Sequence, residues 1–290
     1  MLRIEIDNQE FKIEQDINKL TAKTLIKIAE MSLLQLDESR FRFFAFLAML
    51  EQSNPKWQVL KLKLKVKLSI KFSKTKIGQF LSKFINLKVY NLANEHNSEF
   101  ISHCTDFYFS RRNEIYTAPI QKIQCSIFGF YSGMSDFGET FSFGQFWQAT
   151  VAFLEYQSNP SSDNFRSLLS LLFPKFRLWF FRLSDSNAVY FWRFTRISDP
   201  TKQVILWSFS GIINQIMSEF PNAFVKSKST NEINVEETRD SWLDTLDNIS
   251  GSPDKYDTFN DLNVRYVLRH LDKTIKENKA QKEELEKLKK

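Results

Sequence analysis

The 290-residue chain is 42% hydrophobic and 26% charged, a balance typical of a packed globular protein rather than a disordered one. Lys and Arg outnumber Asp and Glu by 40 to 34, so the net charge of +6 favours an anionic partner without requiring one. With 7 glycines, 2 cysteines and no glycine-rich phosphate motif, the chain fits neither a disulfide scaffold nor a phosphate-loop nucleotide binder.

The first segment, residues 1–92, is predicted to hold a β-hairpin followed by helices. Polarity alternates over residues 2–14, with Asp7-Asn8 as the turn. Thr21 is a suitable N-cap for a helix, and a second helix is expected from about Ser39 to Glu51, ended by Asn54-Pro55. A further helix is expected from Ile77 to about Leu92.

Between these helices lies the most distinctive local pattern, residues 59–76, VLKLKLKVKLSIKFSKTK. Strict alternation predicts a β-strand that carries four lysines on one face: Lys61, Lys63, Lys65 and Lys67. Such a face could neutralise phosphates of a nucleic acid. It could equally be a solvated strand whose lysines protect an edge from aggregation.

The second segment, residues 93–225, is predicted to be a second α+β module. Strands and loops are expected over 93–135, with a hairpin at 107–117 and one strand at 123–133. A helix should begin near Ser142, break at 159–162, and be followed by a helix over 164–172 that Pro174 stops. A second hairpin is expected at 176–197 and a helix at 204–219.

Aromatic and basic residues alternate in that second hairpin. Arg177, Arg182, Trp192 and Arg193 belong to a cluster that resembles a stacking platform for bases. Because consecutive aromatic residues of a strand point to both faces, at least half of them should be core, and the exposed remainder would more often meet protein.

The third segment, residues 226–290, is predicted to be a polar linker, a short helix around 242–249, and a C-terminal helix from 262 to about 288. The first half of this last helix is amphipathic, whereas its end is charged. We expect the residues after Asn278 to fray, or to order only against a partner.

The sequence offers few candidates for catalysis or metal binding. Cys104 and Cys125 are expected to be small buried hydrophobes, because no zinc-ligand spacing occurs. Asp136 and Glu139 are expected to lie in the loop before the Ser142 helix and to help start it. No enzymatic activity, metal or cofactor is therefore expected. No membrane partner or signal peptide is expected either, since apolar runs are short and acids come early.

The order of elements repeats along the chain. A hairpin, a helix opened by Thr or Ser, a break, and an apolar helix starting at Phe-Arg occur first over residues 2–52 and again up to residue 176. This order is consistent with an internal duplication, and equally with two unrelated α+β halves. The expected fold class is α+β, with β-hairpins alternating with helix pairs and a helical C-terminal extension.

Three stretches resemble structural and assembly proteins of tailed bacteriophages: the opening IEIDNQEFKIEQDINKLTAKTLIKI, the stretch FSFGQFWQATVAFLEY, and the C-terminal region from Ser241. The resemblance implies a virion component or a chaperone-like tail-assembly protein, in the cytoplasm of the infected host or in the particle. It implies contacts with other phage structural proteins or with further copies, and transfers no catalytic residue. Nucleic-acid binding through the lysine pattern and the aromatic cluster is the alternative function.

Overall fold

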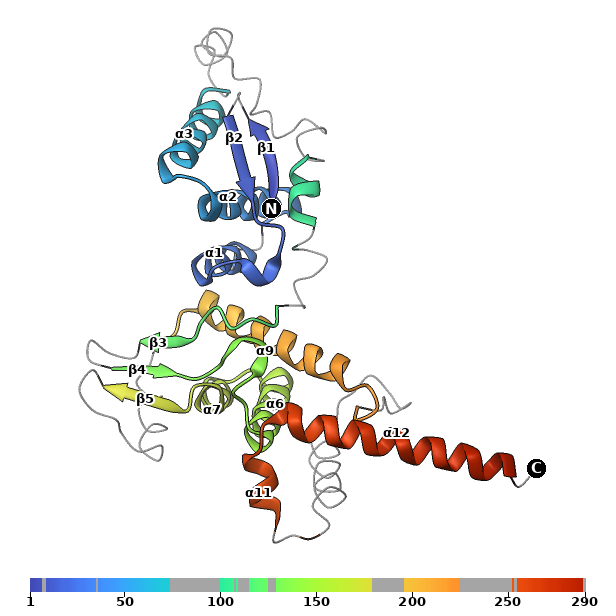
Figure 1. Cartoon of the computed structure of the whole chain (residues 1–290). Helices are drawn as coiled ribbons and strands as arrows, with labels where there is room; N and C mark the ends of the chain where they lie inside the picture. Colours follow the sequence, from blue (N-terminus) through green and yellow to red (C-terminus); the bar gives the residue numbers. More distant parts are fainter. Residues whose placement is uncertain are drawn as a thin grey trace. The chain divides into compact units, whose positions relative to one another are not determined.

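The computed structural model describes residues 1–6, 9–34, 36–73, 100–106, 108, 115–124, 129–178, 196–224, 252 and 255–288. Over this part the chain is mostly helical, with two small antiparallel sheets, which confirms a mixed α+β class (Figure 1). The chain forms two compact units: residues 1–115 with 197–207, and residues 116–196 with 208–290. The bounds of these units differ from those of the three segments expected from the sequence, whose division stays a prediction.

The first unit begins with the expected hairpin. β1 (Leu2–Ile6) pairs antiparallel with β2 (Gln9–Ile13), and Ile4 lies opposite Phe11. Ile4, Phe11 and Ile13 are buried on one face, as the alternating polarity requires. Asn54 holds β2 in place, because its side chain accepts from the Lys12 N–H at 2.8 Å and donates to the Lys12 carbonyl at 2.7 Å.

Two helices follow the short turn η1 (Ile17–Lys19), and the second packs on β2 while the first packs on the second. α1 (Ala22–Leu33) opens on Thr21, whose side chain accepts from the Thr24 N–H, so the predicted N-cap is confirmed. α2 (Glu38–Ser53) opens on Asp37 and ends at Asn54, close to the predicted bounds. Its buried residues, Ala45 to Leu50, face both α1 and β2.

The predicted lysine-rich strand is wrong, because residues Lys56–Ser73 form helix α3. Leu and Lys are good helix formers, and at the start of the helix the Pro55 carbonyl accepts from the Gln58 and Val59 N–H groups, at 3.0 and 3.4 Å. Burial of Val59 and Leu62, three residues apart, fixes the helical period as α3 packs on α2. Residues two apart in a helix are turned by about 200°, so Lys61 and Lys63 lie on different sides of α3 rather than on one face.

The region predicted to be strands and loops contains a helical segment at residues 100–106. Ile101, Cys104 and Thr105 are buried on its inner side, at helical spacing. The predicted helix at 77–92 lies outside the described residues, as does most of the predicted hairpin at 107–117.

The second unit holds a three-stranded antiparallel sheet in the order β3–β4–β5 (Figure 1). β3 (Lys122–Gln124) and β4 (Gly129–Ser132) pair with each other, so the single strand predicted over 123–133 is in fact two strands. β5 (Lys175–Leu178) pairs with β4. The rest of the predicted second hairpin, residues 179–195, lies outside the described part.

Two helices that pack against each other lie between β4 and β5 in the chain. α6 (Phe143–Ser158) opens on Ser142, whose hydroxyl accepts from the Gln145 N–H at 3.2 Å, as predicted. α7 (Ser162–Leu172) follows the predicted break and ends before Pro174. Gly133 brings the end of β4 against α7, where an added Cβ would meet the Leu172 carbonyl oxygen at 2.1 Å.

Three more helices complete the described chain. α9 (Asp199–Glu219) starts earlier than predicted and contributes to both units. α11 (Tyr256–Asp261) was not predicted, whereas α12 (Val264–Leu288) matches the expected C-terminal helix. The predicted linker at 227–240 and short helix at 242–249 lie outside the described residues. In the second unit, Phe209 packs edge-on against Phe141 and Phe153, with ring centroids 6.1 and 5.6 Å away.

Candidate interaction surfaces

The eight candidate contact residues from the sequence fall in both units, and among them the structure describes the side chains of Lys61 and Lys63. Lys61 is exposed and Lys63 is half-buried on α3, and the helix backbone continues through Lys65 and Lys67. Arg177 lies in β5 opposite Phe130. Arg182, Trp192 and Arg193 lie outside the described residues, so the predicted stacking platform stays a prediction.

The inner side of α3 is held by an ion-pair triad. The Glu51 carboxylate of α2 accepts from the ammonium groups of Lys27 on α1 and Lys63 on α3. Although burial raises the pKa of Glu51, the hydrogen bonds from Lys27 and Lys63 outweigh it and hold that pKa below its ordinary value. Lys63 is therefore committed to the fold and does not offer its charge to an outside anion.

The outer side of α3 carries a row of large apolar side chains. Trp57, Leu60 and Leu64 are 53%, 58% and 50% exposed, at the i, i+3, i+7 spacing that places them on one helix face. Lys61 lies over the Trp57 ring, with its Nζ atom 4.7 Å from the ring centroid. We call Trp57, Leu60 and Leu64, with Lys56 and Lys61 beside them, the α3 outer face.

A second candidate surface starts at the root of α12. The Arg265 guanidinium donates to both Glu219 carboxylate oxygens, at 2.8 and 3.1 Å, and to the Phe137 carbonyl at 2.5 Å. The hydrogen bond from Arg265 is the main cause of a lowered pKa of Glu219. One side chain therefore ties α12 to the end of α9 and to the turn η3 (Asp136–Gly138).

That turn has an unusual backbone. Phe137 has a φ of 58° and Gly138 a φ of 66°, a left-handed conformation that a bulky residue adopts only when its surroundings enforce it. The Phe137 N–H donates to the Tyr116 carbonyl, and Asp136 accepts from the Ala118 N–H at 2.7 Å. Asp136 and Glu139 lie before α6 as predicted, and Ser142 supplies the side-chain cap of this helix.

Backbone contacts fix the direction in which α12 leaves the second unit. The Phe143 N–H donates to the Leu262 carbonyl at 2.8 Å, and the Val264 N–H donates to the Phe141 carbonyl at 3.1 Å. About two turns further along, Asp272 accepts from the backbone N–H groups of Asn222 and Ala223, at 2.7 and 3.2 Å. The first half of α12 is thus fastened at both ends.

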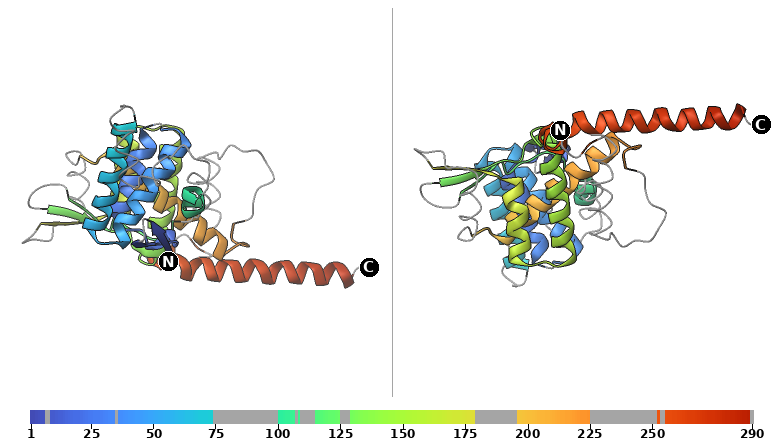
Figure 2. Two further views of the ribbon diagram at one scale, coloured as in Figure 1. Left: turned by 90° about the horizontal axis from the view of Figure 1, so that it is seen from above. Right: turned by 90° about the horizontal axis from the view of Figure 1, so that it is seen from below.

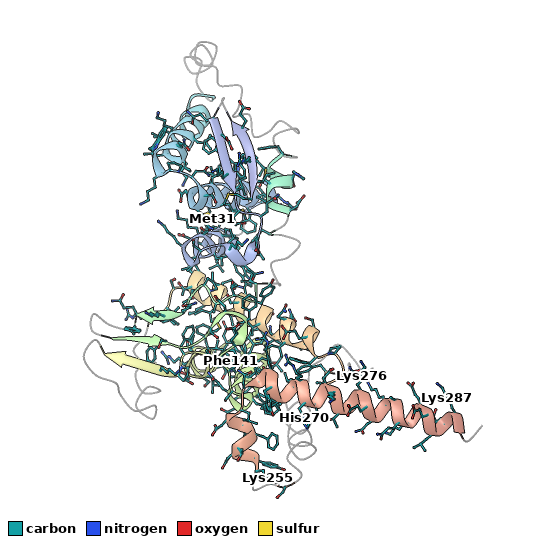
Figure 3. All side chains as sticks on the ribbon, viewed as in Figure 1. Met31, Phe141, Lys255, His270, Lys276 and Lys287 are labelled. Atoms are coloured by element: carbon teal, nitrogen blue, oxygen red, sulfur yellow. The ribbon has the colours of Figure 1, made fainter. Side chains whose placement is uncertain are left out.

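The second half of α12 extends away from these contacts, as both views in Figure 2 show. Every side chain from Lys276 to Lys287 is exposed, and this stretch is called the arm. Figure 3 shows Phe141 in the packed body of the unit, whereas Lys276 and Lys287 lie along the extended helix. Within the described residues, Lys279 of the arm lies close to its unit, with its Nζ atom 3.5 Å from the Asn222 side-chain oxygen.

The cysteines and possible metal ligands are the candidates for catalysis or metal binding. Cys104 is buried, as predicted, and burial raises the pKa of its thiol to about 11, which disfavours the reactive thiolate. Cys125 lies outside the described residues. Among the residues that the structure describes, no cluster of three His, Cys, Asp or Glu side chains could hold a metal ion.

In the described part of the chain, no helix combines the length and apolar character needed to cross a bilayer.

The sequence did not point to the α3 outer face or to the Arg265 contact at the root of α12, for two different reasons. The spacing of Trp57, Leu60 and Leu64 is a helical signal, but the stronger alternation of Leu and Lys hid it. The contact between Glu219 and Arg265 joins residues 46 positions apart, and no local pattern marks it.

Comparisons with protein-family models, with curated proteins and with solved structures found no match to this chain. Function therefore has to be argued from the surfaces themselves.

Proposed function

We propose that the chain is a non-enzymatic protein that acts through protein–protein contacts, with the arm of α12 as a contact element. The observation that carries this proposal is the combination of a firmly fastened root, made by Arg265 and Asp272, with an arm that is exposed on all sides. A helix that packs on nothing gains little tertiary stabilisation, so a fixed exit direction makes sense where a partner receives the helix.

The resemblance to tailed-bacteriophage proteins gives this proposal a setting. In that setting the chain is a structural or tail-assembly protein, acts in the cytoplasm of the infected host, and binds other phage structural proteins or further copies of itself. The mixed charge of the arm, with lysines and glutamates interspersed, suits a polar and reversible contact with an assembling partner.

The finer architecture belongs to the same proposal. β1–β2 precedes the helix pair α1–α2, the strands β3–β4 precede the pair α6–α7, and each pair opens on a Thr or Ser cap. An internal duplication would give the chain two similar interaction modules. It predicts that the two helix pairs superpose in an experimental structure, and a different crossing angle in the two pairs would contradict it.

Site-specific photocrosslinking tests the proposed function in the cells that naturally make the protein. A photoreactive residue is placed at Leu285 in the arm, with Tyr266 in the fastened half as the matched exposed position. We expect discrete protein adducts from position 285 and few from position 266. Adducts with nucleic acid, or equal protein adducts from both positions, would contradict the proposal.

Nucleic-acid binding is the rival function. Residues 56–73 form a helix rather than the predicted strand, and Lys63 pairs with Glu51, so the strand face of four lysines that motivated the rival loses its basis. We expect weak binding of duplex DNA at physiological salt. Submicromolar binding that falls steeply with salt would favour the rival.

A further inference from the structure

The α3 outer face lacks a covering element in the described part of the chain, and its chemistry indicates what could cover it. Three half-exposed apolar side chains, Trp57, Leu60 and Leu64, run along about 10 Å of the helix, or two turns. Helical geometry places Lys56 and Lys61 on opposite sides of this row. Between Lys56 and Ser73 the sequence has no Asp or Glu.

We infer that the α3 outer face binds an amphipathic helix of a partner protein whose apolar stripe is flanked by acidic residues. The apolar row of α3 would pack against the apolar stripe, and Lys56 and Lys61 would pair with carboxylates on either side. Trp57 supplies the large, stiff side chain that commonly anchors an interface core. The inference rests on the proposed function and names a second contact surface for it, separate from the arm.

Two other occupants fit the face less well. Duplex DNA would meet three apolar side chains at the centre of the contact, where phosphates offer them nothing. A bilayer surface takes up side chains that protrude far enough to enter the boundary between headgroups and acyl chains. Trp57, Leu60 and Leu64 instead form a row along two turns of a helix that packs on α2, and such a ridge suits the groove of a facing helix.

The test uses the full chain and a fluorescent helical peptide of about 20 residues, with leucines along one face and glutamates flanking them. A second peptide has lysines in place of the glutamates. We expect fluorescence anisotropy to show saturable binding of the acidic peptide, at least tenfold tighter than the lysine peptide, and weaker at high salt. Equal affinity for the two peptides would overturn the inference.

Matched variants locate the binding on α3. The double variant Leu60→Ala, Leu64→Ala should weaken binding about tenfold or more, and Lys61→Glu about threefold or more, with unchanged thermal unfolding. The controls are Leu34→Ala, a leucine of 60% exposure on the same unit, and Lys23→Glu, an exposed lysine of α1, which should bind like the wild type. Equal losses in the controls, or none in the α3 variants, would overturn the inference.

Two further measurements decide between occupants. Tighter binding to phosphatidylserine vesicles or to duplex DNA than to the acidic peptide, lost in the same α3 variants, would overturn the inference. If the peptide fails to bind while position 285 still gives protein adducts, the α3 occupant is wrong and the proposed function stands. If the peptide binds and position 285 gives no adduct, the inference holds and the role proposed for the arm is wrong.

Discussion

At the scale of single residues, two half-buried carboxylates organise the described parts of the two units. Glu51 joins α1, α2 and α3 through Lys27 and Lys63, and Glu219 joins α9 to α12 through Arg265. Each carboxylate has a lowered pKa, because bonds from cations favour its charged form. Such pairs stabilise little where solvent screens them, but removing one partner of a partly buried pair leaves the other unsatisfied.

Arg265→Ala should lower the free energy of unfolding by about 1–3 kcal/mol, because the Glu219 carboxylate and the Phe137 carbonyl both lose their donor. Arg265→Lys should recover part of the loss, since an ammonium group cannot make the two-pronged contact. Chemical denaturation measures the change, with Lys282→Ala in the arm as control. Equal stability of the wild type and Arg265→Ala would show that this contact does not hold the root of α12.

The lowered pKa values also predict a sensitivity to acid. A carboxylate whose pKa is lower in the folded chain contributes stability above its ordinary pKa of 4.5, and this contribution is lost as pH falls through the lowered value. Glu219→Gln should therefore be less stable than the wild type at pH 7, and the difference should shrink as pH falls below about 4. A difference that grows with acidification would contradict the assignment.

At the scale of elements, helix starts were the most predictable feature and the lysine pattern the least. Thr21 and Ser142 act as N-caps because a hydroxyl satisfies a backbone N–H locally, so the signal is contained in a few residues. The conformation of α3 depends on packing against α2, and the burial of Val59 and Leu62 overrode a period-two pattern. The reversal between β3 and β4 lacked a recognisable turn signal in IQCSIFGFYSG, so two strands were predicted as one.

The close approach of the end of β4 to the end of α7 requires a glycine at position 133. Gly133→Ala would place a Cβ atom 2.1 Å from the Leu172 carbonyl oxygen and 2.5 Å from the Phe173 Cα atom, both backbone atoms that cannot move aside cheaply. We expect a loss of several kcal/mol, comparable with severe overpacking. Gly144→Ala is the matched control, because its Cβ would meet only the Asn260 side chain, at 3.1 Å or more. Similar melting temperatures for the two variants would contradict this packing.

The arm can be tested by its removal. Deleting residues 279–290 should change the melting temperature by no more than about 1 °C, since the arm buries almost no apolar surface. Asp272→Ala, in the fastened half, should lower the free energy of unfolding by about 1–2 kcal/mol, because the backbone N–H groups of Asn222 and Ala223 lose their acceptor. Differential scanning calorimetry separates the two outcomes, and a drop of many degrees on truncation would show that the arm packs on the body.

At the scale of the whole molecule, the sequence predicted the α+β class, the opening hairpin and the C-terminal helix, whose periods are set locally. It could not predict which helix faces stay uncovered, because that depends on contacts between distant residues. Trp57 and Leu60 illustrate this: each is a good core residue by type, yet α3 turns both outward. The proposed function rests on exposed surfaces of this kind, and identifying what binds to them will test it.

The most direct test of contact with other proteins is the size of the particle that contains the chain in the cells that naturally make it. A tagged copy is purified gently, treated with nuclease, and measured by size-exclusion chromatography with light scattering. We predict that the particle has a mass well above that of one chain. This mass should be unchanged by nuclease and should fall when residues 279–290 are deleted. If the mass is that of a larger complex before nuclease treatment and that of a single chain after it, the result would contradict the account and favour nucleic-acid binding.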